Sequence, residues 1–202
     1  MSSRLTPWIA LAGLLLLTFA AYQPALRGGF IWDDDAYVSE NPLLRDLDGL
    51  KRIWTTTETP QYYPLVFTTF WVEYQLWGLD PTGYHVVNVL LHVINALLIG
   101  LALRMLDLRW AWWVAFLFVL HPVHVESVAW ITERKNVLSA LFYLLALIAY
   151  LRFDSRRLRR CYWIALLLFA CALLSKTAAL TLPAAILVIA WWKRGRLLNK
   201  VI

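Results

Sequence analysis

The sequence predicts an all-α membrane protein built as a bundle of transmembrane helices. Hydrophobic residues make up 61% of the 202 residues, charged residues make up only 16%, and the mean hydropathy is +0.60. The apolar residues are concentrated in long runs without charge, and this apolar content is higher than that of a typical soluble domain. Twelve Trp and nine Tyr supply the interfacial anchors that such a bundle uses.

The first apolar run, residues 7–26, is free of charged residues and is long enough to cross a hydrocarbon core of about 30 Å. We interpret it as a retained first span, since it exceeds the apolar core of a cleaved signal peptide and no small-residue cleavage site follows. The polar interval 27–83 predicts a long loop. Within it, Leu65–Leu79 is aromatic and apolar at helical spacing, with Glu73 as its only charge, which favours an amphipathic helix at the membrane interface over a soluble one.

The second apolar run, Tyr84–Leu103, carries polar side chains at spacings of three and four residues, so they form one stripe along a helix. The stripe consists of His85, Asn88, His92 and Asn95. Such a stripe should face other helices or a cavity rather than lipid. We predict hydrogen bonds between helices, and leave open a role in lining the substrate site for His85 or Asn88.

Four further apolar runs follow the second one, and all belong to a single membrane domain, 1–202. Pro122 suits the first turn of a helix that restarts after the third run. The third to sixth runs are short, so as spans they would depend on packing, tilt and interfacial Trp. The predicted spans after the first are about 84–105, 109–121, 136–152, 161–175 and 177–193.

The charges set the expected orientation of these six spans. With a cytoplasmic N-terminus, 12 of the 19 Lys and Arg fall on the cytoplasmic side, whereas Asp107 and Asp154 are the only acidic residues there. This is the bias that the positive-inside rule describes. We therefore predict cytoplasmic N- and C-termini and an extracytoplasmic loop 27–83. The basic stretches are explained as topology determinants, and no nucleic-acid partner is expected.

The same orientation gathers the chemically promising groups on the outer face. Asp33, Asp34 and Asp35 follow the first span, and a carboxylate there can act as a general base on a hydroxyl. Basic residues at the same rim can hold a phosphate, and aromatic residues can stack on sugars. The basic candidates are Arg134, Lys135 and Lys176.

A metal site is the alternative use of these groups. The three aspartates could hold a divalent cation through oxygens, and His121 and His124 with Glu126 could bind a transition metal. The two histidines lack the spacing of a zinc hydrolase motif. We expect no required cofactor and leave a divalent cation open.

Five segments, in this order and spacing, resemble the membrane part of the transmembrane-and-tetratricopeptide-repeat O-mannosyltransferases. These enzymes belong to the C-type (GT-C) glycosyltransferase superfamily. The segments are Phe30-Ile-Trp-Asp-Asp34 with Asn41-Pro42, Tyr63-Pro-Leu65, Gly83-Tyr-His-Val-Val-Asn-Val-Leu-Leu-His92, His121-Pro-Val-His-Val-Glu-Ser-Val-Ala129, and Leu174-Ser-Lys176.

The resemblance implies an inverting transfer of a sugar, often mannose, from a polyprenyl-phosphate donor to a Ser/Thr hydroxyl of a protein or to another acceptor such as a glycan. The family's catalytic pair falls on Asp33 and Asp34, with Asp34 preferred as the base, and Glu126 is expected as the second acidic residue. Arg134 and Lys176 are expected near the donor phosphate. Further donor or acceptor contacts are expected from Asp35, Tyr63, His85, His121, His124 and Lys135.

Two departures from the family are visible. Thr177 stands where animal members usually have an acidic residue, and the family's further spans and helical repeats are missing. We therefore expect a truncated chain, or a module that needs a partner subunit or the absent repeat region. A non-catalytic membrane scaffold and a small transporter are the alternative functions. We expect a multi-pass protein whose active face is extracytoplasmic, and prefer a bacterial inner membrane to an endoplasmic-reticulum membrane.

Overall fold

The structure, a computed structural model, describes the backbone of residues 6–194 and the side chains of residues 11–194. Within this part the chain is helical and contains no β-strand, which confirms the all-α prediction. The charges expected at Arg4, Arg196 and Lys200 lie outside the described residues. The α-helices are α1 (Thr6–Tyr22), α2 (Leu47–Thr55), α3 (Pro64–Trp77), α4 (Pro81–Met105), α5 (Ala111–Leu120), α6 (Val125–Ala129), α7 (Arg134–Arg156), α8 (Arg159–Leu173) and α9 (Leu182–Arg194).

Short helical turns connect several of these helices. Five of them are 3₁₀ turns, and the sixth, η2, is a π-helical turn. Pro122 begins one of them, so the restart predicted at this proline is confirmed. The turns are η1 (Ala25–Arg27), η2 (Asp35–Ser39), η3 (Pro42–Leu44), η4 (Pro122–His124), η5 (Ile131–Glu133) and η6 (Thr177–Thr181).

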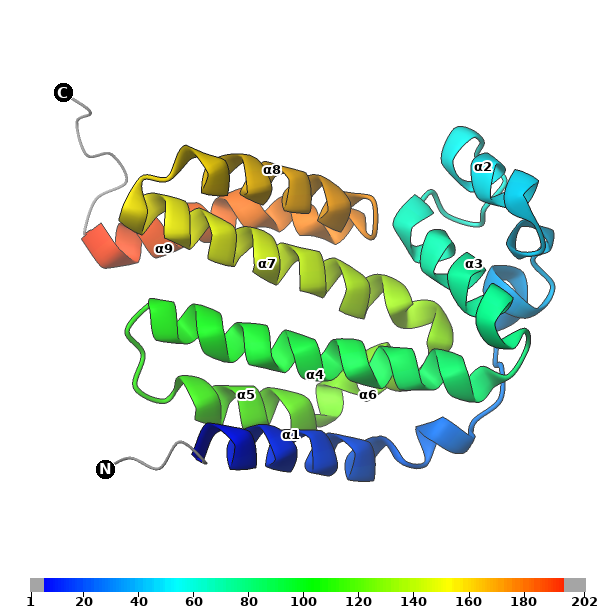
Figure 1. Ribbon diagram of the computed structural model, residues 1–202, viewed down its shortest axis with the longest axis horizontal. Helices are drawn as coiled ribbons and strands as arrows, with labels where there is room; N and C mark the ends of the chain where they lie inside the picture. The colour runs from blue at the N-terminus through cyan, green and yellow to red at the C-terminus, as the bar shows by residue number, and fades with distance from the viewer. Residues whose placement is uncertain (1–5, 195–202) are drawn as a thin grey trace.

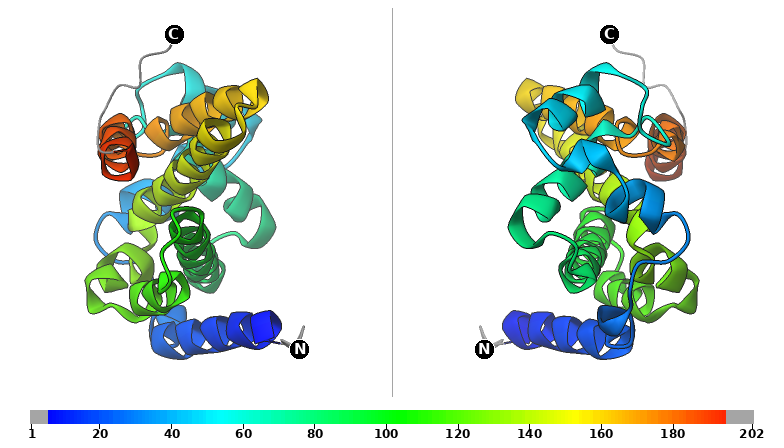
Figure 2. Two further views of the ribbon diagram at one scale, coloured as in Figure 1. Left: turned by 90° about the vertical axis from the view of Figure 1, so that its left-hand side faces the viewer. Right: turned by 90° about the vertical axis from the view of Figure 1, so that its right-hand side faces the viewer.

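Helices α4 and α7 form the centre of the bundle. α7 packs most extensively on α8 and α4, and α4 packs in turn on α5 and α1. Figure 1 shows α1 and α5 on one side of this pair, α8 and α9 on the other, and the α2–α3 region gathered at one end. The two end views place α1 at the edge of the bundle (Figure 2). The loop between α1 and α4 therefore covers the end where α4 and α7 begin.

By length and composition, two helical segments can cross a membrane: Pro81–Met105, and Ile131–Arg156, which includes η5 and α7. A third is possible if α5 and the segment Pro122–Ala129, bent by 56°, count as one span. The apolar part of α1, Leu11–Tyr22, is shorter. These helices indicate a membrane protein, whereas the six-span count and the orientation stay predictions.

The polar stripe of α4 is buried against neighbouring helices, as predicted. The side-chain amide of Asn88 donates to the carbonyl of Trp130 at 3.1 Å, and that of Asn95 donates to the carbonyl of Val137 at 2.8 Å. His92 Nε2 lies 3.2 Å from the carbonyl oxygen of Val119. Each bond joins α4 to another segment, which is how buried polar groups stay satisfied in a bundle.

Helix α3 differs from the amphipathic helix that we expected. Its only charged side chain, Glu73, lies on the buried face together with Val66, Phe67 and Phe70 rather than on a polar outer face. The reason is a buried arginine in α7, described below. The buried face of α3 packs on Tyr84 and Leu138, which are among the core residues at this end of the bundle.

Candidate functional site

The three consecutive aspartates lie in three different environments. Asp34 is completely buried, whereas Asp33 and Asp35 are exposed. Asp34 Oδ1 accepts hydrogen bonds from the backbone N–H of Thr132 at 2.8 Å and from its hydroxyl at 2.6 Å. Its Oδ2 accepts from the backbone N–H of Ile31 at 3.0 Å. Asp34 therefore fastens the loop after α1 to the segment that begins α7.

The other two aspartates are not anchored in this way. Asp35 Oδ1 accepts from the hydroxyl of Ser39 at 2.8 Å within the turn η2. The carboxylate of Asp33 has no hydrogen-bond partner among residues 11–194. Asp33 is thus the member of the triplet with both carboxylate oxygens unengaged by the described residues.

Unusual backbone on both sides of Asp33 presents this carboxylate. Trp32 has φ of 50°, a left-handed conformation that is uncommon for a bulky residue. The turn η2, directly after Asp34, is π-helical, and such turns are frequent at functional sites. The Trp32 ring is 74% exposed and contacts the Trp130 ring edge-on, with centroids 5.1 Å apart. The pair forms an open aromatic surface beside the aspartates.

A cluster of charges lies at the start of α7, one residue beyond Thr132. Glu133 pairs with Lys135 at 2.9 Å and lies 3.9 Å from Lys176, which precedes η6. Asn136 connects these groups, because its amide donates to Glu133 while its carbonyl accepts from Lys176. We call these four residues, Glu133, Lys135, Asn136 and Lys176, the rim cluster.

Tyr37 lies between the aspartate loop and the rim cluster. Lys135 Nζ lies 5.4 Å from the centre of its ring, and its hydroxyl donates to Gln61 at 2.8 Å. Burial raises the pKa of Tyr37 to about 12, and the nearby carboxylates of Asp33 and Glu133 add to that shift. Tyr37 therefore stays protonated at neutral pH. Its backbone N–H donates to the carbonyl of Asp33 at 3.0 Å, which joins it to the aspartate loop.

The Tyr63 segment contacts the Lys176 segment, although the two are far apart in the chain. The backbone N–H of Leu65 donates to the carbonyl of Leu174 at 3.4 Å, which joins the start of α3 to the end of α8. Tyr63 itself is half-buried at the start of α3, beside the core that includes Tyr37. Two segments that suggested the family resemblance therefore meet beside the rim cluster.

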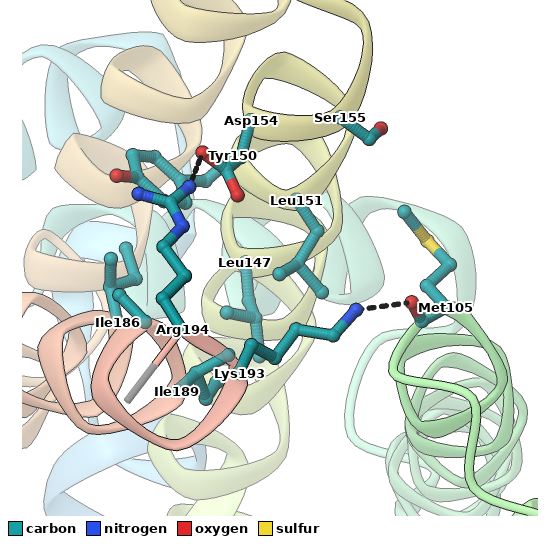
Figure 3. A pocket seen from close by; sticks show the side chains of 11 residues that line it. Met105, Leu147, Tyr150, Leu151, Asp154, Ser155, Ile186, Ile189, Lys193 and Arg194 are labelled. Carbon is teal, nitrogen blue, oxygen red and sulfur yellow. Dashed lines mark hydrogen bonds and ion pairs between the residues drawn. The ribbon is translucent and has the colours of Figure 1, made fainter. Parts of the chain in front are cut away.

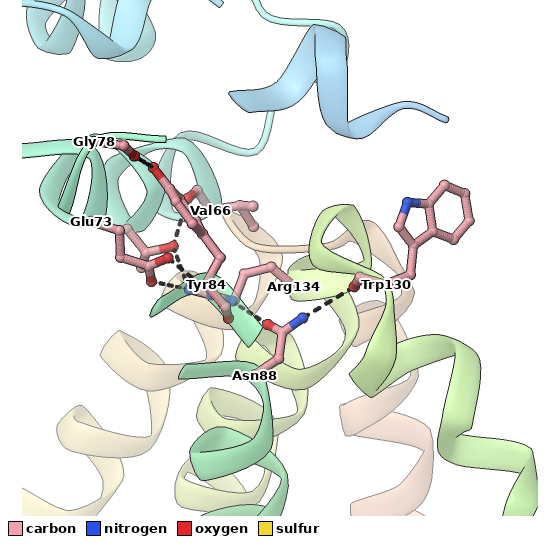
Figure 4. Close-up of polar contacts among 8 residues, drawn as sticks. Val66, Glu73, Gly78, Tyr84, Asn88, Trp130 and Arg134 are labelled. Carbon is pink, nitrogen blue, oxygen red and sulfur yellow. Dashed lines mark hydrogen bonds and ion pairs between the residues drawn. The ribbon is translucent and has the colours of Figure 1, made fainter. Parts of the chain in front are cut away.

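Arg134, expected near a donor phosphate, is instead enclosed by protein. Its side chain is 0% exposed and forms a two-pronged ion pair with Glu73, with one N–O distance of 3.1 Å. It also donates to the side chain of Asn88 and to the Tyr84 carbonyl (Figure 4). A further hydrogen bond goes to the hydroxyl of Thr69. All five N–H donors of the guanidinium are used, so none is left for a phosphate.

The Arg134 network joins α3, α4 and α7 at one point. Burial raises the pKa of Glu73, and the positive charge of Arg134 opposes that rise. Because Thr132, Lys135 and Asn136 lie within two residues of Arg134, the network fixes the position of the segment that holds Asp34 and the rim cluster. Its role is to hold the site in place.

The histidines of the predicted site have structural contacts. His121 Nδ1 accepts from the backbone N–H of Val123 at 3.2 Å and caps η4. His124 packs on the ring of Phe118, with centroids 4.2 Å apart. His85 is buried against Gly28, and a Cβ added to this glycine would lie 3.3 Å from Nε2 of His85. The ring nitrogens of His85 have no hydrogen-bond partner among the described residues. Their expected contacts with donor or acceptor stay predictions.

Glu126 is exposed on α6, and its carboxylate has no ion-pair partner among residues 11–194. The next residue, Ser127, accepts a hydrogen bond from the amide of Asn136 at 2.9 Å, which links α6 to the rim cluster. In the part of the chain that the structure describes, no three His, Cys, Asp or Glu side chains are grouped to hold a metal ion. The divalent cation stays an open expectation.

A groove of about 310 Å³ leads away from the rim cluster between α4, α5, α7 and η6. Asn136 and Lys176 lie at its polar part, and the remaining walls are mostly apolar. Ile99, Phe118 and Leu144 are among the apolar residues. The groove can therefore accept a molecule with an anionic head and an apolar tail.

The sequence did not single out Glu133 or Asn136 as site residues. Both belong to the polar segment Thr132-Glu-Arg-Lys-Asn136, which was predicted to lie on the same face as the aspartates. The helical register explains why Arg134 turns into the core while Asn136 faces the rim, because successive helical residues point about 100° apart. Lys135 is also buried, but its ammonium reaches Glu133 in the rim cluster.

The contact between Thr132 and Asp34 gives a first prediction. We expect Thr132→Val to lower the free energy of unfolding by about 1–3 kcal/mol, since one hydrogen bond to a fully buried carboxylate is lost while side-chain shape is kept. Thermal unfolding of the detergent-solubilised protein measures this. Thr55→Val, at an exposed position whose hydroxyl bonds only its own helix, is the matched control, and equal losses in both variants would contradict the anchor role.

Comparison with known proteins identifies relatives of this chain. It is 30% identical over 190 residues to a protein O-mannosyl-transferase of Caenorhabditis elegans, with 87% of this chain and 27% of the relative covered. It is 34% identical over 183 residues to the protein O-mannosyl-transferase Tmtc1 of Drosophila melanogaster, with 85% of this chain and 21% of the relative covered. It is 33% identical over 175 residues to the human protein O-mannosyl-transferase TMTC4, with 74% of this chain and 24% of the relative covered.

No protein-family model and no solved structure matches the chain. The chain spans about a quarter of the length of the relatives named here. These relatives are eukaryotic, so the comparisons give no support to our preference for a bacterial inner membrane. The resemblance predicted from the sequence is nevertheless confirmed: the chain is a TMTC-like membrane region, homologous to part of the TMTC-type protein O-mannosyl-transferases.

Proposed function

We propose that this chain is the membrane module of a glycosyltransferase that moves a sugar from a polyprenyl-phosphate donor to a hydroxyl of a protein. The observation that carries the proposal is that the lysine-containing rim cluster lines an apolar groove and contacts Tyr37, whose backbone N–H donates to the carbonyl of the exposed Asp33. The names of the relatives support a protein acceptor and a mannose-like sugar.

The donor would lie with its phosphate at Lys176 and its prenyl chain along the groove. Lys176 supplies a positive charge that can balance the phosphate as the bond to the sugar breaks. Lys135 is buried and pairs with Glu133 at 2.9 Å, so it balances that carboxylate and leaves the rim cluster with a net positive charge. Arg134, which sequence motifs placed near the phosphate, takes no part in binding and holds the start of α7 in position.

The acceptor hydroxyl would lie beside Asp33. The family resemblance preferred Asp34 as the base, but Asp34 is buried and both of its oxygens already accept hydrogen bonds from the protein, so we propose Asp33 instead. The oxygen of the acceptor hydroxyl attacks the anomeric carbon of the sugar from the side opposite the phosphate, while Asp33 takes the hydroxyl proton. The bond between the anomeric carbon and the phosphate oxygen breaks, and the polyprenyl phosphate leaves with both electrons. Glu126, exposed on α6, is the candidate for the second acidic residue.

Lys176→Met tests the donor site. We expect the KM for polyprenyl-phosphate mannose to rise about 10–100-fold, the effect of losing a charged hydrogen bond to phosphate. The measurement is transfer of radiolabelled mannose to a Ser/Thr-rich acceptor protein by the chain in lipid nanodiscs. The control is Lys51→Met, at an exposed position on α2. An unchanged KM in the Lys176 variant contradicts the donor site, and no transfer by the unaltered chain contradicts the proposed function.

A further inference from the structure

A small crevice opens at the end of the bundle opposite the rim cluster, where α4, α7 and α9 end. Its volume is about 80 Å³. Its floor is apolar and includes Leu147, Leu151 and Ile189, whereas Lys193, Arg194 and Ser155 lie around it (Figure 3). A crevice with a basic mouth and an apolar floor suits an amphiphile with an anionic head.

The two basic residues of the crevice are only partly occupied by protein groups. Arg194 pairs with Asp154 through one terminal nitrogen, and the structure gives its other N–H groups no partner among residues 11–194. Lys193 Nζ lies 3.4 Å from the carbonyl oxygen of Met105 and 3.7 Å from Asp107, whose side chain is 89% exposed. Exposed pairs of this kind contribute little to stability, so an incoming anion can replace them.

The surroundings of the crevice carry a large positive excess. The turn from α7 to α8 adds exposed arginines, which have no ion-pair partner among the described residues. They are Arg152, Arg156, Arg157, Arg159 and Arg160. Basic pockets between helices at a membrane surface are typical sites for anionic lipid headgroups.

Exposed tryptophans mark the level at which this end meets the membrane surface. They occur at the start of α5, in the second turn of α8 and near the end of α9. Tryptophan is enriched at the headgroup level of bilayers. The residues, 55–70% exposed, are Trp110, Trp113, Trp163, Trp191 and Trp192.

We propose that this crevice binds an anionic phospholipid from the adjoining leaflet. The headgroup phosphate lies between Lys193 and Arg194, and an acyl chain follows the apolar floor between α7 and α9. The site is independent of the glycosyltransferase site, which lies at the other end of α7. Asp154 competes with the lipid phosphate for Arg194.

Because Asp154 competes with the lipid for Arg194, removing the charge of Asp154 should strengthen lipid binding. Asp154→Asn should strengthen binding of dioctanoyl phosphatidylglycerol about fivefold, and the double variant Lys193→Gln/Arg194→Gln should weaken it about 25-fold, at about fivefold per charge. The matched control, Arg159→Gln/Arg160→Gln, removes the same charge from the same end outside the crevice and should change binding less than threefold. Native mass spectrometry of the full chain in detergent measures each dissociation constant.

Two further probes identify the ligand. Dioctanoyl phosphatidylcholine and inorganic phosphate should bind at least tenfold more weakly than the anionic lipid, because one lacks net charge and the other lacks an acyl chain. Ile189→Trp fills the floor without changing charge and should also weaken lipid binding. The proposal would be overturned if the two double variants lose the same lipid affinity. It would also be overturned if Asp154→Asn does not bind the lipid more tightly although this variant unfolds at the same temperature as the unaltered chain. Equal binding of phosphate and lipid would overturn it as well.

Discussion

Asp33→Asn is expected to lower the rate of sugar transfer by about 10²–10⁴-fold, the usual contribution of a general base. The amide keeps the shape of the side chain but cannot take the hydroxyl proton. Binding of the donor should change little, so the loss should appear in kcat rather than in the KM for polyprenyl-phosphate mannose. Because Asp33 is exposed and makes no side-chain hydrogen bond to residues 11–194, the variant should also unfold at the same temperature as the unaltered chain.

The neighbouring aspartates are the controls for this variant. Asp35→Asn should keep most of the activity, since Asp35 only caps its own turn through Ser39. Asp34→Asn should destabilise the protein, because Thr132 donates two hydrogen bonds to one oxygen of a buried carboxylate. If Asp33→Asn transfers sugar at the unaltered rate while a folded Asp34→Asn variant does not, the base is Asp34 and our assignment is wrong.

Local sequence patterns were sufficient to predict the apolar helices and the contacts of three of the four residues in the α4 stripe, whereas the short helix α2 was not predicted and His85 makes no hydrogen bond to the described residues. The charge-free runs predicted helices because an apolar segment of that length has few other stable forms in a membrane. Asn88, His92 and Asn95 recur at helical spacing, so one helix face had to find partners, and the structure supplies them. Pro122 likewise marked a helix start, because the backbone N–H that proline lacks has no partner within the first turn of a helix.

The environment of each aspartate could not be predicted in the same way. Asp33, Asp34 and Asp35 are identical residues, and what distinguishes Asp34 is Thr132, 98 positions away in the sequence. The role of Arg134 depends on Glu73, 61 positions away, in a helix whose single charge suggested an exposed face. Such pairs are decided by how α3 docks on α4 and α7, and a periodicity within one segment carries no information about docking.

Arg134→Met is expected to have the largest effect on stability, a loss of about 3–5 kcal/mol in the free energy of unfolding. The physical reason is that Glu73 would be left buried without its cationic partner, while Asn88 and the Tyr84 carbonyl would each lose a donor. Thermal unfolding in detergent, followed by circular dichroism, measures the loss. The exposed pair Arg52–Glu58 provides the control, because Arg52→Met should leave the unfolding temperature unchanged.

A second variant separates the buried charge from the packing around it. Glu73→Leu combined with Arg134→Met removes both charges and keeps apolar volume, so it should recover most of the stability lost in the single variant. Burial raises the pKa of Glu73 and the charge of Arg134 opposes that rise, so desolvation works against the ionised pair. If the double variant is as unstable as Arg134→Met alone, the hydrogen bonds to Asn88 and Tyr84, rather than the ion pair, hold α7 against α4.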